Sequence, residues 1–300
     1  MTEKNLVNML SIDVEDYFHV SAFERISPLC SWDKREGRVE RNTDRILSLL
    51  ETHSIKATFF ILGWVAERHH ALVKRISAEG HEIASHGYNH QRVTKQSRVL
   101  FRDDVRRSKY LLEDLTGKEV GGYRAPSYSI SPATYWAFDE LYDAGYQYDS
   151  SVFPVKHDFY GMPNWPRFAV TVVKKQDGSW VPAEDDAVGE KSLQEFPIST
   201  LSIAGKNIPV AGGGYFRLYP YILSRWALNR INKNEKQPFM FYLHPWELDC
   251  QQPRMQGAGV KSNFRHYLNL DRTEDRFRAL LQDFSFSSIR EVRKSSSSDH

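Results

Sequence analysis

The 300-residue sequence has few of the features that mark several large classes of protein. Its two cysteines, Cys30 and Cys250, are too few for a disulfide framework, and neither has the nearby cysteine partner that a thiolate zinc site requires. The formal net charge is only +2, so the chain lacks the basic excess that is typical of proteins that bind DNA or RNA. We therefore expect free, reduced thiols and no nucleic-acid partner.

Long apolar runs are absent as well. The chain starts with Met1, Thr2 and Glu3 and reaches an acidic cluster at Asp13 without the apolar core of a secretory signal. No run of the roughly 18 apolar residues that a membrane-spanning helix needs occurs in the sequence. We therefore expect a protein without a transmembrane segment that works in the cytoplasm. Aromatic residues, in contrast, make up 13% of the chain, and composition alone does not explain them.

Strand-like and helix-like patterns alternate over the first half of the chain. The predicted strands are residues 6–12, 57–62, 81–84 and 122–125, and the predicted helices begin near residue 42 and cover 64–79, 97–115 and 132–144. Either Asn42 or Thr43 is the expected cap of the first helix. This repetition is typical of an α/β fold with a parallel sheet or barrel.

The pattern changes after residue 152, where prolines and aromatic residues interrupt it. Residues 170–175 and 180–182 flank Asp177-Gly178, which is typical of a hairpin turn. A helix at 219–232 and a buried strand at 239–243 complete the predicted elements.

Charged side chains and imidazoles lie directly after several of these predicted strands. In a parallel α/β barrel the carboxyl ends of the strands share one rim, and active sites form there. The residues in such positions are Asp13, Glu15, Asp16, His86, His90, Arg124, Asp149 and His244. The sequence therefore predicts that separate segments deliver carboxylates, imidazoles and a guanidinium to one site.

His86 and His90 are the natural metal ligands in this set, because imidazole is the commonest nitrogen ligand of zinc. The pair lacks the glutamate that follows the first histidine in the helical zinc protease motif. A carboxylate from another strand end would complete three ligands and leave positions open for water and substrate, as in catalytic sites. Taken alone, the pair fits two ordinary core or surface histidines equally well.

Five short motifs occur in order within residues 6–245. They are Ser11-Ile12-Asp13-Val14-Glu15-Asp16, Ser85-His86-Gly87-Tyr88-Asn89-His90, Tyr123-Arg124-Ala125-Pro126-Ser127, Tyr148-Asp149-Ser150-Ser151 and Leu243-His244-Pro245. Together they resemble the polysaccharide deacetylase family, also called the NodB homology group or carbohydrate esterase family 4. Three more segments resemble the subgroup encoded beside exosortase and exopolysaccharide gene clusters: Glu195-Phe196-Pro197, Gly212-Gly213-Gly214-Tyr215-Phe216-Arg217 and Phe264-Arg265-His266-Tyr267-Leu268-Asn269.

The resemblance implies a distorted (β/α) barrel with an added C-terminal segment. It also implies a bound divalent metal, expected to be Zn²⁺, that serves to remove N-acetyl groups from amino sugars. The implied ligands are His86, His90 and an acid of the first motif. The family commonly has two adjacent aspartates in that motif, whereas Asp13 is separated here from Glu15. Related deacetylases with an Asp-x-Asp/Glu pattern use the later acid on the metal, so the resemblance assigns Glu15 to the metal, and Asp16 remains the alternative.

The remaining roles are also those that the resemblance implies. Asp13 would act as the general base, with Arg124 orienting it. The backbone N–H of Ser127, which stands where the family usually has an aromatic residue, would help to stabilise the oxyanion. His244 would act as the general acid for the leaving amine, with Asp149 holding its imidazole.

Five aromatic residues lie beside these motifs or in the long loop, where their rings could stack on sugar faces. They are Tyr128, Trp165, Tyr215, Phe216 and Trp246. Ordinary packing in the core or in a loop is the alternative interpretation of each ring.

We expect a single deacetylase domain over residues 1–291, with core motifs within 6–245, additions at about 155–220 and 246–291, and a disordered tail at 292–300. The leading hypothesis is metal-dependent hydrolysis of N-acetyl groups on N-acetylhexosamine units of an exopolysaccharide or its precursor, either free in the cytoplasm or beside the exopolysaccharide machinery. The alternatives are hydrolysis of a small non-sugar amide or cyclic imide on the same fold, and a catalytically silent glycan-binding or assembly protein. The oligomeric state is left open.

Overall fold

The computed structural model of the chain describes residues 6–157, 160–183 and 191–297. They fall into two compact units: unit 1 contains the residues up to 59, residues 78–82 and those from 210 onward, and unit 2 contains 60–77 and 83–209. Three elements, β2 (Thr58–Ile61), α3 (His70–Ala78) and β3 (Glu82–Ser85), have residues in both units. Among the described residues, no helix is both long and apolar enough to cross a membrane.

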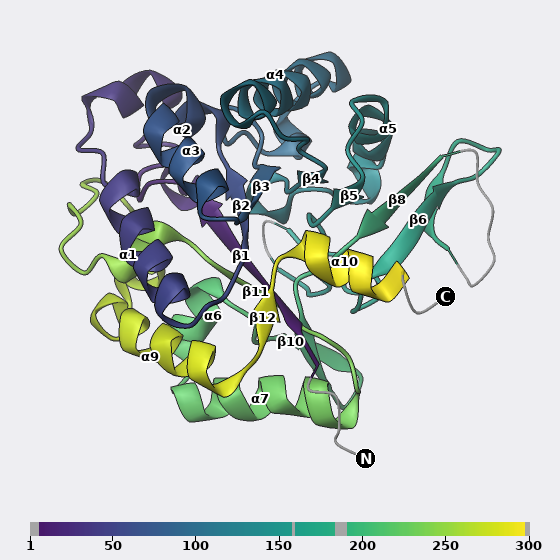
Figure 1. Cartoon of the computed structure of the whole chain (residues 1–300). Helices are drawn as coiled ribbons and strands as arrows, with labels where there is room; N and C mark the ends of the chain where they lie inside the picture. The colour runs from purple at the N-terminus through teal and green to yellow at the C-terminus, as the bar shows by residue number, and fades with distance from the viewer. Residues whose placement is uncertain (1–5, 158–159, 184–190, 298–300) are drawn as a thin grey trace. The chain divides into compact units, whose positions relative to one another are not determined.

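Unit 1 is built around β1 (Asn8–Val14), a strand whose seven residues are all buried. It pairs in parallel with β11 (Met240–Leu243) and β12 (Phe286–Ser287). The helices of the unit are α1 (Val39–Thr52), α6 (Gly213–Leu218), α7 (Tyr221–Asn234), α8 (Val260–Tyr267), α9 (Leu270–Asp283) and α10 (Ile289–Ser297), with 3-10 turns η1 (Ser21–Phe23), η2 (Leu29–Lys34) and η6 (Pro245–Leu248). Helices α6 and α7 both pack against α9 (Figure 1).

The N-terminus of α1 corrects a sequence expectation. The helix begins at Val39, and both residues that we expected to cap it, Asn42 and Thr43, are buried inside it. The capping acceptor is Asp16, whose Oδ2 accepts the N–H groups of Arg38 (2.5 Å) and Val39 (2.9 Å). A cap from a residue more than 20 positions away leaves no local pattern in the sequence.

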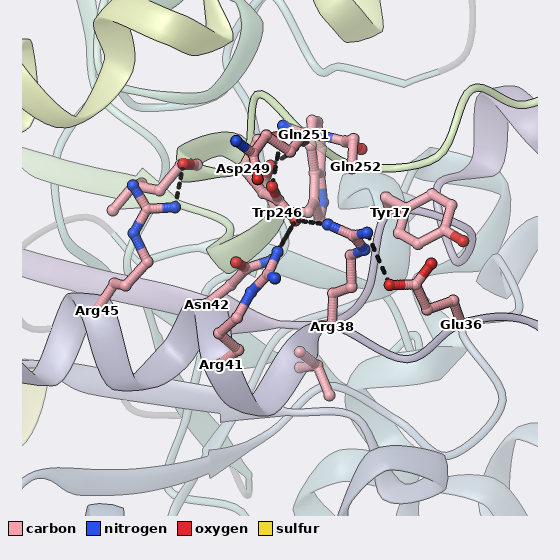
Figure 2. Close-up of polar contacts among 12 residues, drawn as sticks. Tyr17, Glu36, Arg38, Arg41, Asn42, Arg45, Trp246, Asp249, Gln251 and Gln252 are labelled. Carbon is pink, nitrogen blue, oxygen red and sulfur yellow. Dashed lines mark hydrogen bonds and ion pairs between the residues drawn. The ribbon is translucent and has the colours of Figure 1, made fainter.

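Asp249 ties α1 to the segment that follows η6. Its Oδ2 accepts hydrogen bonds from Arg38 (3.2 Å), Arg41 (2.9 Å) and Asn42 (3.3 Å), as Figure 2 shows. The carboxylate is almost completely buried, and these partners lower its pKa although burial opposes that shift. The contacts hold the chain that follows His244 against α1.

Unit 2 contains most of a mixed sheet. The strands β3, β4 (Gly122–Tyr123), β5 (Tyr148–Asp149), β8 (Ser192–Glu195), β6 (Val170–Lys174) and β7 (Trp180–Pro182) neighbour one another in this order, and β9 (Thr200–Ile203) and β10 (Lys206–Pro209) form a separate pair. The pairs from β3 to β8 are parallel, whereas β6 runs antiparallel to both β8 and β7. The hairpin predicted around Asp177-Gly178 is confirmed as β6 and β7.

The helices of unit 2 follow the predicted pattern with one division. They are α2 (Gly63–Arg68), α3, α4 (Arg98–Thr116) and α5 (Trp136–Asp143), with 3-10 turns η3 (Val93–Lys95), η4 (Pro126–Tyr128) and η5 (Pro132–Thr134). The helix expected at 64–79 is therefore two helices, α2 and α3. The helix predicted at 97–115 is confirmed as α4: Ser97 caps it by accepting the N–H of Leu100, and it ends at Gly117, whose φ of 64° is left-handed. Helices α4 and α5 lie side by side (Figure 1).

These elements confirm the expected α/β fold class. At the C-terminus, α10 runs to Ser297 and so extends through most of the tail that we expected to be disordered. Residues 298–300 lie outside the described residues. Cys30 and Cys250 are free and exposed.

Candidate functional site

In unit 1, the register of β1 and β11 brings the ends of these two strands together. Ile12 is paired with Leu243, so Asp13 and His244 are the next residues on the two parallel strands. The Nε2 atom of His244 lies 3.9 Å from Asp13 Oδ2 and 3.4 Å from Glu15 Oε1. Asp13 and Glu15 are both buried, at 2% exposure each. The predicted base, acid and carboxylate ligand of unit 1 therefore share one small region.

Glu247 fixes the other side of the His244 ring. Its Oε1 lies 2.7 Å from Nδ1 of His244 and accepts the backbone N–H of His244 at 3.1 Å. Its Oε2 accepts a hydrogen bond from Nε of Arg217 at 2.6 Å. Both oxygens of this fully buried carboxylate are thus occupied by donors. We expected Asp149 to hold the imidazole of His244, and the carboxylate that holds it at Nδ1 is that of Glu247.

The neighbouring charged groups determine the protonation states of His244 and Glu247. Burial alone would lower the pKa of His244, but the hydrogen bond to Glu247 and the charges of Glu15, Glu247 and Asp13 raise this pKa to about 9. Burial would raise the pKa of Glu247, but the charge of Arg217 and the contact with His244 lower it to about 2. The pair therefore favours an imidazolium beside a carboxylate.

The C-terminal part of the chain holds Arg217 in place. Nη1 of Arg217 donates to the carbonyls of His266 (2.8 Å) and Leu268 (3.0 Å). The side-chain amide of Asn269 donates to the backbone carbonyl of Arg217 (2.7 Å). The two segments that resembled the exopolysaccharide subgroup, at 212–217 and 264–269, are therefore joined through this arginine. Because Arg217 binds Glu247, their contacts extend to His244.

Trp246 packs against the imidazole of His244. Its ring stacks on His244, with 5.2 Å between ring centroids, and on His266, with 4.3 Å. Its Nε1 donates to Glu15 Oε1 at 3.4 Å. Trp246 is only 4% exposed, so the structure gives it a packing role under His244 instead of an open sugar-stacking face.

Asp16 is committed to the backbone. Besides capping α1, its Oδ1 accepts the N–H of Tyr17 at 2.9 Å, and its own N–H donates to His19 Nδ1. Burial raises the pKa of Asp16 to about 6, although these N–H groups oppose the shift. Its oxygens already have structural partners, which favours Glu15 over Asp16 as the metal ligand.

In unit 2, the loop after β3 carries both predicted histidine ligands. Nδ1 of His86 lies 2.8 Å from the carbonyl oxygen of Arg124, and a carbonyl can only accept, so Nδ1 carries the proton and Nε2 is the basic nitrogen. This is the orientation in which metal-ligating histidines are usually held. The rings of His86 and His90 are 5.3 Å apart, and His90 adopts a left-handed φ of 51°.

Asp104 from α4 holds this histidine loop, and sequence reasoning missed it. Its carboxylate accepts the N–H groups of Tyr88 (2.9 Å) and Asn89 (3.3 Å). Burial raises its pKa to about 6. A Cβ on Gly87, whose φ is +70°, would lie 2.8 Å from Asp104 Oδ1. The only sequence signal was an acidic residue on the inward face of a predicted helix, next to a glycine-containing loop.

Arg124 is completely buried and bound to the fourth motif. It donates to the carbonyl of Ser150 (3.1 Å) and to its hydroxyl (2.9 Å). Its guanidinium lies 4.0 Å from the ring centroid of Phe60. Ser127, in the same motif, adopts a left-handed conformation with φ 55°. Such strained backbone is concentrated at functional sites.

Asp149 and Glu195 form a fully buried carboxyl pair in unit 2. Burial and the neighbouring Asp149 raise the pKa of Glu195 well above its ordinary value, and burial raises the pKa of Asp149 to about 6. These shifts favour a protonated Glu195 beside Asp149. Asp149 accepts from Ser151, whose hydroxyl accepts the N–H of Ala125. The pair thus supports the strand ends that carry Arg124.

The other predicted sugar-stacking rings are mostly packed. Tyr128 and Trp165 are each 6% exposed; Tyr128 packs on Phe153, and Trp165 stacks on Phe138. Tyr215 is half-buried, and Phe216 is fully buried against Phe241. In the described part of the chain, many of the aromatic side chains are therefore buried in the core.

The chemistry of three predicted residues fits a divalent metal. Glu15 offers a carboxylate oxygen, and His86 and His90 each offer an imidazole nitrogen; Glu15 and His86 are buried, and His90 is half-buried. The fixed tautomer of His86 presents its basic Nε2. This donor set, two nitrogens and one oxygen, is typical of catalytic zinc sites.

Comparisons with known proteins agree with this chemistry. Residues 29–148 match the polysaccharide deacetylase family, and residues 150–294 match a domain of unknown function, DUF3473. A peptidoglycan-N-acetylglucosamine deacetylase of Bacillus cereus is 40% identical over 84 residues, which are 28% of this chain and 30% of the relative. A peptidoglycan deacetylase of Helicobacter pylori is 33% identical over 108 residues, 36% of each chain. The chain thus spans about a third of the length of these relatives.

The fold has a solved counterpart. A Mycobacterium smegmatis protein assigned to the polysaccharide deacetylases superposes with a TM-score of 0.58 at 18% identity, covering 100% of this chain and 93% of that one. At this identity the likeness shows the fold alone. The five motifs, the two family matches and the fold lead to one conclusion: the chain contains a polysaccharide deacetylase domain, matched over residues 29–148, and a following region, residues 150–294, that matches the DUF3473 family.

Proposed function

We propose that the protein hydrolyses the N-acetyl groups of N-acetylhexosamine units in an exopolysaccharide or its precursor, with the help of a divalent metal, most simply Zn²⁺. The observation that carries the proposal is His244, held between Glu247 on one side and Asp13 and Glu15 on the other. Hydrolysis of an acetamide needs a base for water and an acid for the amine, and these residues supply both. The two relatives are named as deacetylases of peptidoglycan, a glycan with the same acetamido group.

His86, His90 and Glu15 would hold the metal. When bound, it would lower the pKa of a water molecule and polarise the acetyl carbonyl. The carbonyl of Arg124 keeps His86 in the tautomer that this role requires. Asp104 keeps the loop between the two histidines in shape.

The protein's own residues would move the protons. Asp13 would take a proton from water as its oxygen attacks the acetyl carbon, with the Ser127 N–H donating to the developing oxyanion. His244 would then protonate the amine nitrogen as the C–N bond breaks, which gives acetate and a free amino sugar. Glu247 and Arg217 keep His244 oriented for this transfer. The Asp149 and Glu195 pair would support the strand ends that carry Arg124, the residue that would orient Asp13.

The test is acetate release from N-acetylglucosamine oligomers by the purified protein. We expect activity in the wild type and its loss in Asp13→Asn and in His244→Ala. Full activity in both variants would contradict the assigned base and acid. Turnover of small amides without any release from sugars would favour the non-sugar alternative. The cytoplasmic location stays a prediction, and finding the protein in the periplasmic fraction would contradict it.

A further inference from the structure

The solvent-facing side of α7 in unit 1 exposes an unusual amount of apolar surface. Ile222 is 73% exposed, Leu223 52% and Trp226 51%, and Leu218 just before the helix is 47% exposed. Trp226 is half-exposed, although tryptophan side chains are highly buried on average. Clustered apolar residues of this kind on one helix face mark a binding surface.

The opposite side of α7 is firmly attached to its unit. Ser224, Ala227, Leu228 and Ile231 are buried, and the helix packs on α9. Tyr221 donates to Asp283 at 2.6 Å, and Arg225 lies 3.0 Å from the same carboxylate. The exposed face is therefore preformed, and a partner would not have to order it.

The charge on this helix has one sign. Arg225, Arg230 and Lys233 lie in α7, which contains no acidic residue, and no aspartate or glutamate occurs between Glu195 and Glu235. Arg230 and Lys233 are exposed and follow Trp226 by four and seven residues, so they continue the face of Ile222 and Trp226 along the helix. The face is thus apolar in its first half and basic in its second half.

We propose that this face of α7 binds the surface of an anionic lipid bilayer. Isoleucine, leucine and tryptophan beside arginine and lysine are the composition of helices that lie in the plane of a membrane interface. With 14 residues, α7 is too short to cross a bilayer. The basic half complements anionic headgroups, whereas a purely apolar protein interface would gain nothing from it. The inference is independent of the proposed catalytic function.

The experiment measures co-sedimentation of the full chain with vesicles of phosphatidylcholine, with and without phosphatidylglycerol. We expect binding to the anionic vesicles that weakens with salt. Arg230→Ala with Lys233→Ala should weaken it by about 25-fold, taking about fivefold for each charge. Ile222→Ser with Trp226→Ser should weaken it by at least about tenfold. Val99→Ser with Leu100→Ser on α4, at residues 59% and 58% exposed, is the matched control and should bind like wild type.

Three results would overturn the proposal. The first is no binding of the wild type to anionic vesicles, and the second is unchanged binding by both α7 variants. The third is a wild-type dimer in light scattering that Ile222→Ser with Trp226→Ser converts to a monomer, because the face would then be an interface between two copies of the chain. The melting temperature of each α7 variant should stay near that of the wild type, because the four replaced side chains are exposed.

Discussion

Replacing Glu247 by glutamine probes the site through one atom. Both oxygens of Glu247 act as acceptors: Oε1 for the N–H and Nδ1 of His244, and Oε2 for Nε of Arg217. A glutamine has one oxygen and one NH₂ group, so in either orientation a donor faces a donor. If the NH₂ group faces His244, Nδ1 becomes the acceptor and the imidazolium that donates from Nε2 is lost.

The magnitude follows from these contacts. One unsatisfied buried donor costs about 1–3 kcal/mol, and leaving Arg217 as an uncompensated buried charge costs about 3–5 kcal/mol of stability. General acid catalysis contributes about 10²–10⁴ in rate, so we expect Glu247→Gln to lower kcat by at least about 100-fold with little change in KM. The alkaline limb of the kcat profile should move down from about pH 9, because removing the carboxylate lowers the pKa of His244.

The assay is acetate release from N-acetylglucosamine oligomers across pH, with stability measured by urea unfolding. Asp249→Asn is the matched control, because Asp249 is a buried carboxylate in the same segment that binds α1 and not His244 (Figure 2). It should lose stability and keep its pH profile. A Glu247→Gln variant that folds and keeps kcat within about twofold of wild type would show that Glu247 does not prepare His244 for acid catalysis.

Three further predictions concern the metal ligand of the first motif, the histidine loop and the pH dependence of stability. Asp16→Ala should lower the free energy of unfolding in urea by about 1–2 kcal/mol and keep the metal, because Asp16 caps α1. Glu15→Ala should lose the metal in elemental analysis. Metal loss in Asp16→Ala but not in Glu15→Ala would make Asp16 the metal ligand. Gly87→Ala should cost about 1–3 kcal/mol, because its φ is +70° and Asp104 blocks a Cβ; an unchanged urea midpoint would contradict this. Burial lowers the pKa of His81 to about 4. As the pH falls below about 6.5, the unfolded state therefore binds a proton that the folded state does not bind. The free energy of unfolding should drop by about 1.4 kcal/mol per pH unit down to about pH 4. His81→Asn should remove that part of the slope, and an identical slope in wild type and variant would show that another group causes it.

The sequence predicted what local patterns and ordered motifs encode. Alternating apolar runs indicated the α/β class, Ser97 and Gly117 bounded α4, and Asp177-Gly178 marked the hairpin of β6 and β7. The positions of Asp13 and His244 at the ends of predicted strands pointed to their proximity, because parallel strands in register bring their ends together.

The partners of these residues were beyond the reach of local patterns. Arg217 and Glu247 are 30 residues apart, and Arg217 reaches the carbonyl of Leu268 across 51 residues. No local pattern favours Glu247 over Asp149 as the partner of His244, since either carboxylate fits the chemistry. Trp165 could not be assigned to core or surface either, because burial depends on which rings the folded chain packs against it.

The most direct test of the account is acetate release from N-acetylglucosamine oligomers before and after treatment with a chelator, followed by addition of Zn²⁺. We predict that the chelator abolishes acetate release and that Zn²⁺ restores it in the wild type but not in His86→Ala. Acetate release that the chelator leaves unchanged would contradict the metal-dependent mechanism at its centre.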